Sequence, residues 1–125
     1  MSLTDRELAK LNQQQVQSGT PIARVGNYAG ADAAAYHDVV SWTVAALKVG
    51  KLKELSYISD NFPKTHWKLS IGGVQQFTDT ILQSALTQPF PRGNRLATGA
   101  VVLVQAKSTD GTAVNAQGSI AGSER

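Results

Sequence analysis

Hydrophobic and polar residues alternate most clearly in two runs near the C-terminus, 101–106 and 114–120. The second run, VNAQGSI, has one apolar face and one polar face. A period of two residues is typical of half-buried β-strands. Asp110-Gly111 lies between the runs, and an Asp-Gly step supplies the positive φ angles that a tight turn requires. The sequence therefore predicts a β-hairpin here, and we take it as the organising element of the chain.

Two further segments upstream also have a strand-like pattern. Residues 40–44 alternate between apolar and hydroxyl side chains, and residues 51–59, KLKELSYIS, alternate with a slip in phase near Glu54-Leu55. One extra residue in a strand produces such a slip, so we expect a β-bulge at this point. The cluster 60–63, DNFP, then predicts a turn, because Asp and Asn tolerate turn geometry and proline cannot donate to a strand ladder.

The middle of the chain predicts a second hairpin. Residues 67–71 alternate, Gly72-Gly73 interrupts them, and the chain returns through 74–77. The next segment, 80–87, is short and bounded by threonines, and we interpret it as a strand rather than a short helix. Residues 88–99, QPFPRGNRLATG, are expected to form the longest loop, with Leu96 closing the bottom of the core.

These segments give six or seven short strands at regular spacing with turn residues between them. Such a pattern is typical of an antiparallel β-sandwich or a barrel-like version of one. Trp42 and Trp67 share their phase with aliphatic neighbours, so we expect both to lie in the core. The predicted fold class is all-β, with an additional N-terminal arm.

The arm is predicted from residues 1–35. Residues 4–7, TDRE, fit a capping box and predict a helix over about residues 5–17, with few apolar positions. Residues 18–35, with three glycines and one proline, have no sustained period and are interpreted as an extended segment. The alternative is that 18–35 forms an irregular edge of the domain itself. The sequence thus predicts an arm over 1–35 and a sandwich over 36–125.

Composition narrows the possible functions. The 125 residues include no cysteine, which excludes disulfides, thiolate chemistry and cysteine-bound metals, and the net charge is +3. No apolar run is long enough for a membrane span, and residues 1–10 lack the apolar core of a signal peptide. The excess of lysines is spread among apolar residues, unlike a phosphate-tracking stripe, so nucleic-acid binding is not expected. The spread-out lysines are Lys48, Lys51, Lys53, Lys64 and Lys68.

No candidate catalytic, cofactor or metal site is predicted. His37 and His66 have no further histidine at ligand spacing, whereas a zinc site needs three or four convergent ligands. The sequence has no GxSxG elbow and no phosphate-binding glycine loop. Asp60, Asp79 and Asp110 each lie at or beside a turn, where aspartate bonds its own backbone. The sequence therefore predicts a protein that is not an enzyme.

Three features can be taken together: the polar helical stretch TDRELAKLNQQQVQ, the segment SGTPIARVGNYAGADAAA and the cysteine-free body ending in VVLVQAKSTDGTAVNAQGSIAGSER. In these features the chain resembles small all-β structural proteins of virus particles, particularly capsid decoration or cement proteins of tailed phages. The resemblance implies a homo-oligomeric virion subunit, assembled in the host cytoplasm, that binds a protein lattice through its arm. The arm residues expected to contact the partner are Leu3, Leu8, Leu11, Val16, Ile22, Val25 and Tyr28.

A different class of function is a binding module, most plausibly a β-sandwich that binds a carbohydrate or a receptor. Aromatic faces on a sandwich stack on sugars, and the loop QPFPRGNR is expected to form part of the contact surface. The residues expected to contact such a ligand are Tyr57, Trp67, Phe90, Arg92 and Arg95. Oligomers that form without a ligand would favour the first class, whereas a glycan-dependent thermal shift would favour the second.

Overall fold

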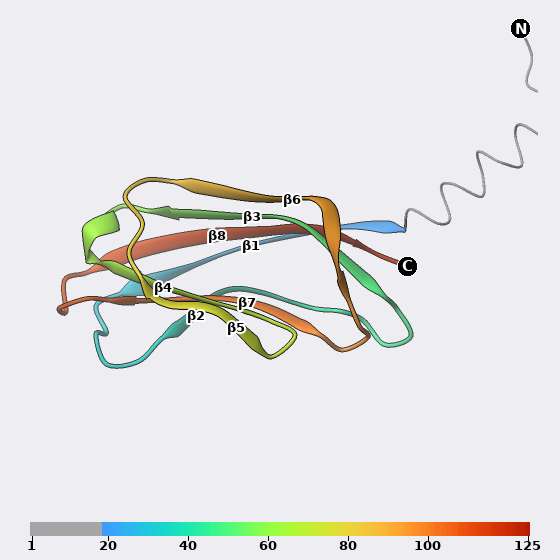
Figure 1. The fold of residues 1–125 in the computed structure, drawn as a ribbon. Coiled ribbons are helices and arrows are strands. Elements are labelled where there is room, and N and C mark those ends of the chain that lie inside the picture. The colour runs from blue at the N-terminus through green and yellow to red at the C-terminus, as the bar shows by residue number, and fades with distance from the viewer. Residues whose placement is uncertain (1–18) are drawn as a thin grey trace, which may run out of the picture.

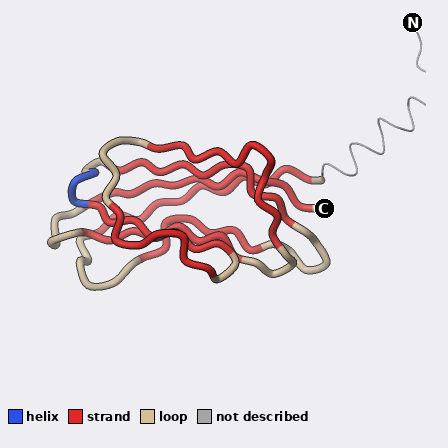
Figure 2. Tube along the Cα trace, in the orientation of Figure 1, coloured by secondary structure: helices blue, strands red, loops and turns tan. Residues whose placement is uncertain are grey.

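A computed structural model of the protein describes residues 19–125, which form two four-stranded antiparallel sheets packed face to face (Figures 1 and 2). The strand orders are β1-β8-β3-β6 and β2-β7-β4-β5. The predicted β-sandwich is confirmed, with eight strands rather than six or seven. No α-helix occurs in residues 19–125, and the helix predicted over 5–17 lies outside them. The elements are β1 (Thr20–Gly30), β2 (His37–Thr43), β3 (Gly50–Ser59), a 3-10 helix η1 (Phe62–Lys64), β4 (Thr65–Ile71), β5 (Val74–Thr80), β6 (Leu86–Leu96), β7 (Val101–Ser108) and β8 (Val114–Glu124).

The segment predicted as an extended arm contains β1, which is part of the sandwich. It pairs with β8 along its whole length, from Thr20 opposite Glu124 to Gly30 opposite Val114. The domain boundary predicted at residue 36 is therefore wrong. The alternative, that residues 18–35 form an edge of the domain itself, gives the position of β1 correctly. β1 is a regular strand rather than an irregular edge. The sequence of β1 shows no sustained alternation of apolar and polar residues because β1 is an edge strand. Of its residues, only Ile22 and Tyr28 pack against the core.

The last two strands do not form the predicted hairpin. β7 pairs with β2 and β4, whereas β8 pairs with β1 and β3 in the opposite sheet. The Asp110-Gly111 turn therefore carries the chain from one layer to the other. Gly111 has a φ of 91°, so the need for glycine at this step is confirmed. Alternation alone cannot distinguish the two arrangements, because the apolar faces of both strands point into the core in either case.

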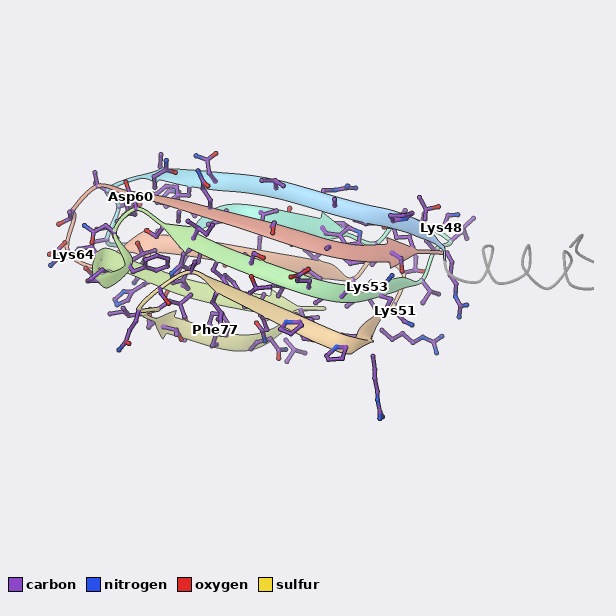
Figure 3. The ribbon with its side chains drawn as sticks, turned by 90° about the horizontal axis from the view of Figure 1, so that it is seen from above. Lys48, Lys51, Lys53, Asp60, Lys64 and Phe77 are labelled. Atoms are coloured by element: carbon purple, nitrogen blue, oxygen red, sulfur yellow. The ribbon has the colours of Figure 1, made fainter. Side chains whose placement is uncertain are left out.

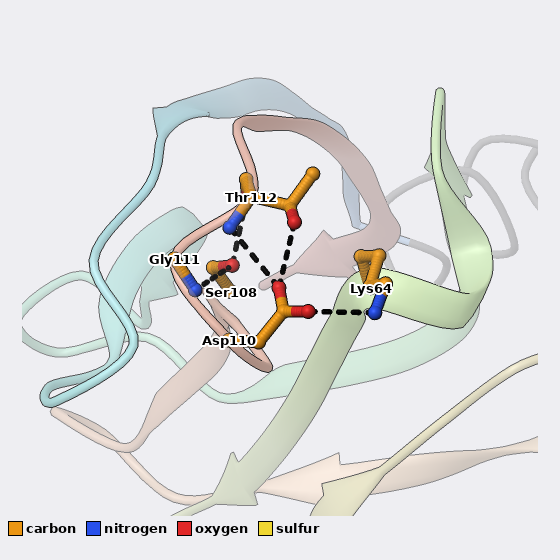
Figure 4. A network of polar contacts seen from close by, with 5 residues as sticks. All are labelled: Lys64, Ser108, Asp110, Gly111 and Thr112. Carbon is orange, nitrogen blue, oxygen red and sulfur yellow. Dashed lines mark hydrogen bonds and ion pairs between the residues drawn. The ribbon is translucent and has the colours of Figure 1, made fainter.

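A polar network holds this turn in place (Figure 4). Asp110 accepts a hydrogen bond from the Lys64 ammonium at 2.6 Å and, on its other oxygen, from the Thr112 hydroxyl and amide. The buried Ser108 hydroxyl accepts from the Gly111 amide and donates to the Thr112 carbonyl. Because Lys64 belongs to η1, the network ties the loop between the sheets to the loop before β4.

The network predicts a specific response to acid. The hydrogen bond from Lys64, followed by those from Thr112, lowers the pKa of Asp110 from 3.8 to about 2. A carboxylate with a lowered pKa stabilises the fold at pH values above its ordinary pKa, and this contribution is lost as the pH falls through about 2. We expect Asp110→Asn to lower Tm at neutral pH and to flatten the fall of Tm between about pH 4 and pH 2. Melts followed by circular dichroism would check this. Parallel acid profiles for the two proteins would contradict it.

Of the other predicted elements in the middle of the chain, a hairpin and a bulge are confirmed, whereas one strand is wrong. The β4–β5 hairpin is confirmed, with φ of 59° and 81° at Gly72 and Gly73. The bulge in β3 is also confirmed, since its register shifts between Leu52 and Glu54. The strand predicted over 80–87 is wrong for most of its length, because β5 ends at Thr80 and β6 starts at Leu86.

The predicted loop 88–99 lies mostly in β6. β6 is an edge strand that bends sharply part-way along (Figure 1). Prolines are tolerated in an edge strand because some of its amides need no partner, which explains why Pro89 and Pro91 did not prevent the strand. Leu96 is 3% exposed, so its predicted place in the core is confirmed.

The core contains the large aromatic residues of both sheets. Trp42 on β2, Trp67 on β4 and Tyr57 on β3 are all at most 1% exposed, and the predicted core positions of the tryptophans are confirmed. The indole Nε1–H of Trp42 donates to Glu124 at 2.8 Å. The hydroxyl of Tyr57 donates to Gln88 at 3.0 Å, and burial raises the pKa of this tyrosine.

The two sheets come close together along the edge formed by β1 and β2. Gly26 on β1 lies opposite Gly118 on β8, and both glycines face β2. A Cβ at Gly26 would overlap the carbonyl oxygen of Val39, at the register shift in β2. The absence of side chains at this glycine pair therefore permits the close packing of the sheets.

Candidate binding surface on strands β3 and β6

The residues predicted to contact a ligand do not form one group. Tyr57 and Trp67 are 0% exposed, so their predicted role in ligand contact is wrong, and both are core residues. Their rings pack edge to face, 5.5 Å apart. Phe90, Arg92 and Arg95 all lie on β6, where the arginines are exposed and Phe90 is half-buried. The structure thus retains the β6 part of the predicted ligand site.

The structure describes three of the seven predicted partner-binding residues, and these three differ in exposure. Leu3, Leu8, Leu11 and Val16 lie outside the described residues. Ile22 is partly buried against the core, and Tyr28 stacks on His37 at a ring distance of 4.5 Å. Val25 is 83% exposed on β1, so among the three described residues it alone presents most of its side chain to solvent. Attachment to a protein lattice stays a prediction.

Sequence reasoning did not assign two further cations to a site, although they lie beside these arginines. Leu52 and Leu55 of β3 point into the core and are 0% exposed, which leaves Lys51 and Lys53 on the outer face. Both lysines lie near the bend of β6 (Figure 3). Lys51 is directly opposite Arg95 in the β3–β6 register. We define the β3–β6 surface as Lys51, Lys53, Phe90, Arg92 and Arg95.

An irregularity in β6 shapes this surface. Asn94 pairs with Leu52 and Pro89 pairs with Glu54, so residues 90–93 have no partner in this register. Gly93 has a φ of 72°, and a Cβ there would overlap the aliphatic stem of Lys51. Glycine therefore permits both the local backbone conformation and the position of the lysine across it.

Two of the depressions on this surface share Lys51 and Lys53. The first has a volume of about 310 Å³ and lies over the unpaired part of β6. The second has a volume of about 250 Å³ and lies between β3, β6 and the end of β8. The first is lined by Lys51, Lys53, Pro89, Phe90, Pro91, Arg92 and Gly93, and the second by Val49, Gly50, Lys51, Lys53, Arg95, Ser123 and Arg125.

Within the described residues, no acidic side chain forms an ion pair with the cations of the β3–β6 surface. Within residues 19–125, the side chains of its two lysines and two arginines form no ion pair or hydrogen bond. β6 has no acidic residue, and β3 has only Glu54. The carboxylate of Glu124 on β8 accepts from Trp42 and from the Ala45 amide instead. The surface is therefore suited to a ligand that is polar or negatively charged.

The other polar groups considered from sequence have structural roles. Asp60 accepts from the Asn115 amide at 2.9 Å. Asp79 accepts from the Tyr36 hydroxyl at 2.5 Å, and this hydrogen bond lowers the pKa of Asp79. His37 contacts Asp32 at 2.8 Å. No group of three potential metal ligands occurs in the described part of the chain. In residues 19–125 no helix has the length and apolar character of a membrane span.

Comparisons with known proteins return little. No protein-family model matches the chain, and no curated protein matches it. Among solved structures, the chain is similar to the CBM36-1 domain of a multidomain xylanase from the hindgut metagenome of Trinervitermes trinervoides. The two share 16% sequence identity with a TM-score of 0.40, over 81% of this chain and 96% of that domain.

Proposed function

We propose that this chain is a non-catalytic β-sandwich module that binds carbohydrate on the β3–β6 surface. The observation that carries the proposal is the set of four cationic side chains without partners in residues 19–125, arranged around two shallow depressions. Each arginine offers five N–H donors and each lysine three. Sugar hydroxyls and ring oxygens accept such hydrogen bonds, so the surface has many donors for a polar ligand.

The shape of the surface favours an extended ligand. Sites for small molecules are usually clefts that bury most of the ligand, whereas these depressions lie side by side on the outside of a sheet. Phe90 lies between two prolines and forms part of one depression. Phe90 packs against the core, and the part of its side chain that stays exposed adds an apolar contact beside the cations, a combination that suits the polar and apolar faces of a sugar chain.

The same residues support a role in binding rather than hydrolysis. Glycoside hydrolases generally use a pair of carboxyl groups on either side of the scissile bond. Strands β3 and β6 together contain one carboxylate, Glu54. The proposed role of the surface is therefore to hold a glycan without cleaving it.

A glycan array probed with the full-length chain would test the proposal. We expect binding to at least one glycan class, and the double variant Lys51→Gln/Arg95→Gln should weaken it by about tenfold or more, because hydrogen bonds from charged donors are lost. Lys68→Gln, on β4 of the other sheet, is the matched control and should bind as the unmodified protein does. Absence of binding to every glycan, or equal binding by the double variant, would contradict the proposal.

A further inference from the structure

We infer that the ligand of the β3–β6 surface is an acidic polysaccharide, whose sugars carry carboxylate or sulfate groups. This inference rests on the proposed function and specifies its ligand. It starts from a feature that is unfavourable in the free protein, namely two cations placed opposite each other on adjacent strands.

Lys51 and Arg95 are direct neighbours across the β3–β6 ladder. Side chains in this position have Cβ atoms about 4.5–5.5 Å apart, and like charges there are destabilising. Neither side chain has a counter-ion among residues 19–125. An anion bound between the two would convert this repulsion into charge-assisted hydrogen bonds from both side chains.

The local backbone favours that arrangement. The stem of Lys51 lies across Gly93, where any Cβ would overlap it, so glycine leaves room for the lysine beside β6. Arg95 presents a planar guanidinium, which binds carboxylate or sulfate through two parallel hydrogen bonds. The pair therefore offers one flexible and one directional donor to the same anionic group.

Further cations extend the surface in two directions. Lys53 follows two residues after Lys51 on β3, and Arg92 lies in the unpaired part of β6. Both lysines line the two depressions, whereas Arg92 lines the one over β6. A polymer with an acidic group on successive sugars could contact these cations in turn, which a single small anion could not do.

The surface does not suit a nucleic acid equally well. Proteins that hold single strands combine cations with several aromatic rings, on which successive bases stack. Phe90 is the only aromatic residue of the β3–β6 surface, and it is half-buried. The surface therefore offers cations to charged groups but lacks a row of aromatic rings on which successive bases could stack.

Calorimetric titration with matched polymers would test the inference. We expect polygalacturonate or dextran sulfate to bind about tenfold or more tightly than its neutral counterpart, fully methyl-esterified polygalacturonate or plain dextran. Binding should weaken between about 50 mM and 500 mM NaCl, because salt screens exposed charges. Lys51→Gln/Arg95→Gln should lose about tenfold or more in affinity, whereas Lys68→Gln should not.

A second measurement separates ligand binding from a structural role. Because the double variant removes a repulsive pair, its Tm without ligand should equal or exceed that of the unmodified chain. Loss of affinity together with a lowered Tm would overturn the inference by showing that the pair supports the fold.

The remaining outcomes are distinguishable. Equal binding of acidic and neutral polymers would overturn the inference and leave the proposed function in place. Absence of binding to any polysaccharide would overturn both. Polyuridylate binding as tightly as the acidic polymers, with the same dependence on Lys51 and Arg95, would overturn the inference in favour of nucleic acid.

Discussion

A chain shortened to begin at residue 31 should lose its cooperative melt. The deletion removes β1, an 11-residue strand that pairs with β8 from end to end. β8 would become an edge strand with the backbone groups of one side unpaired, and the core would lose its contacts with Ile22 and Tyr28. Because native domains are stable by only about 5–15 kcal/mol, the loss of an entire strand should exceed what the remaining structure tolerates.

Differential scanning calorimetry would measure this effect, and a chain beginning at residue 19 provides the control. The control keeps all eight strands and every core residue found in the described structure, so we expect it to melt cooperatively. The domain boundary predicted from sequence leads to the opposite expectation, with folding unaffected by removal of residues 1–30. A sharp, unshifted transition for the chain beginning at residue 31 would support that boundary and contradict the role given to β1.

The second large effect is expected at Gly26. Its backbone does not have a positive φ, but a Cβ there would overlap the Val39 carbonyl oxygen. The overlapping atom belongs to the backbone of β2, so relief requires the two sheets to separate along this edge. Overpacking typically costs about 1–3 kcal/mol, and we expect Gly26→Ala to fall at the upper end, about 3 kcal/mol by urea denaturation.

Gly73→Ala separates steric overlap from backbone strain. A Cβ at Gly73 would have no atom within 4 Å, but its φ is 81°. Gly73→Ala should therefore lower the free energy of unfolding by about 1–2 kcal/mol, because only the left-handed backbone conformation is unfavourable for a residue with a Cβ. If Gly26→Ala proves milder than Gly73→Ala, the close contact between β1 and β2 is not a constraint on the fold.

Sequence reasoning found the strands that have one face in the core. β4 is the clearest case, because Trp67, Leu69 and Ile71 are buried while Lys68 and Ser70 are partly exposed. It missed β1 and β6, which are edge strands with few core contacts and contain glycine or proline. The alternating pattern records burial, so it weakens where a strand is held mainly by backbone hydrogen bonds.

Pairing was harder to predict than the strands themselves. Residues 101–106 and 114–120 have the pattern of hairpin strands, yet an apolar face is required equally by strands that face each other across the core. The two lysines of the β3–β6 surface were not assigned to a site for a related reason. Lys51 and Arg95 are far apart in sequence, and only the β3–β6 register places them opposite each other. The burial of Tyr57 could have been anticipated, because it shares a face with Leu55 after the bulge.

The position of β8 between β1 and β3 has a consequence for synthesis on the ribosome. Within residues 19–125, β1 is the first of the eight strands to be made and β8 the last, yet β8 is the only described strand that pairs with β1. Until residues 114–124 have left the exit tunnel, β1 has no partner and β3 can pair only with β6. Unpaired strand edges promote aggregation, and long-range pairing is slow. The sheet that carries the β3–β6 surface should therefore close only after translation of β8, and the nascent chain should be most prone to misassembly in the interval before it.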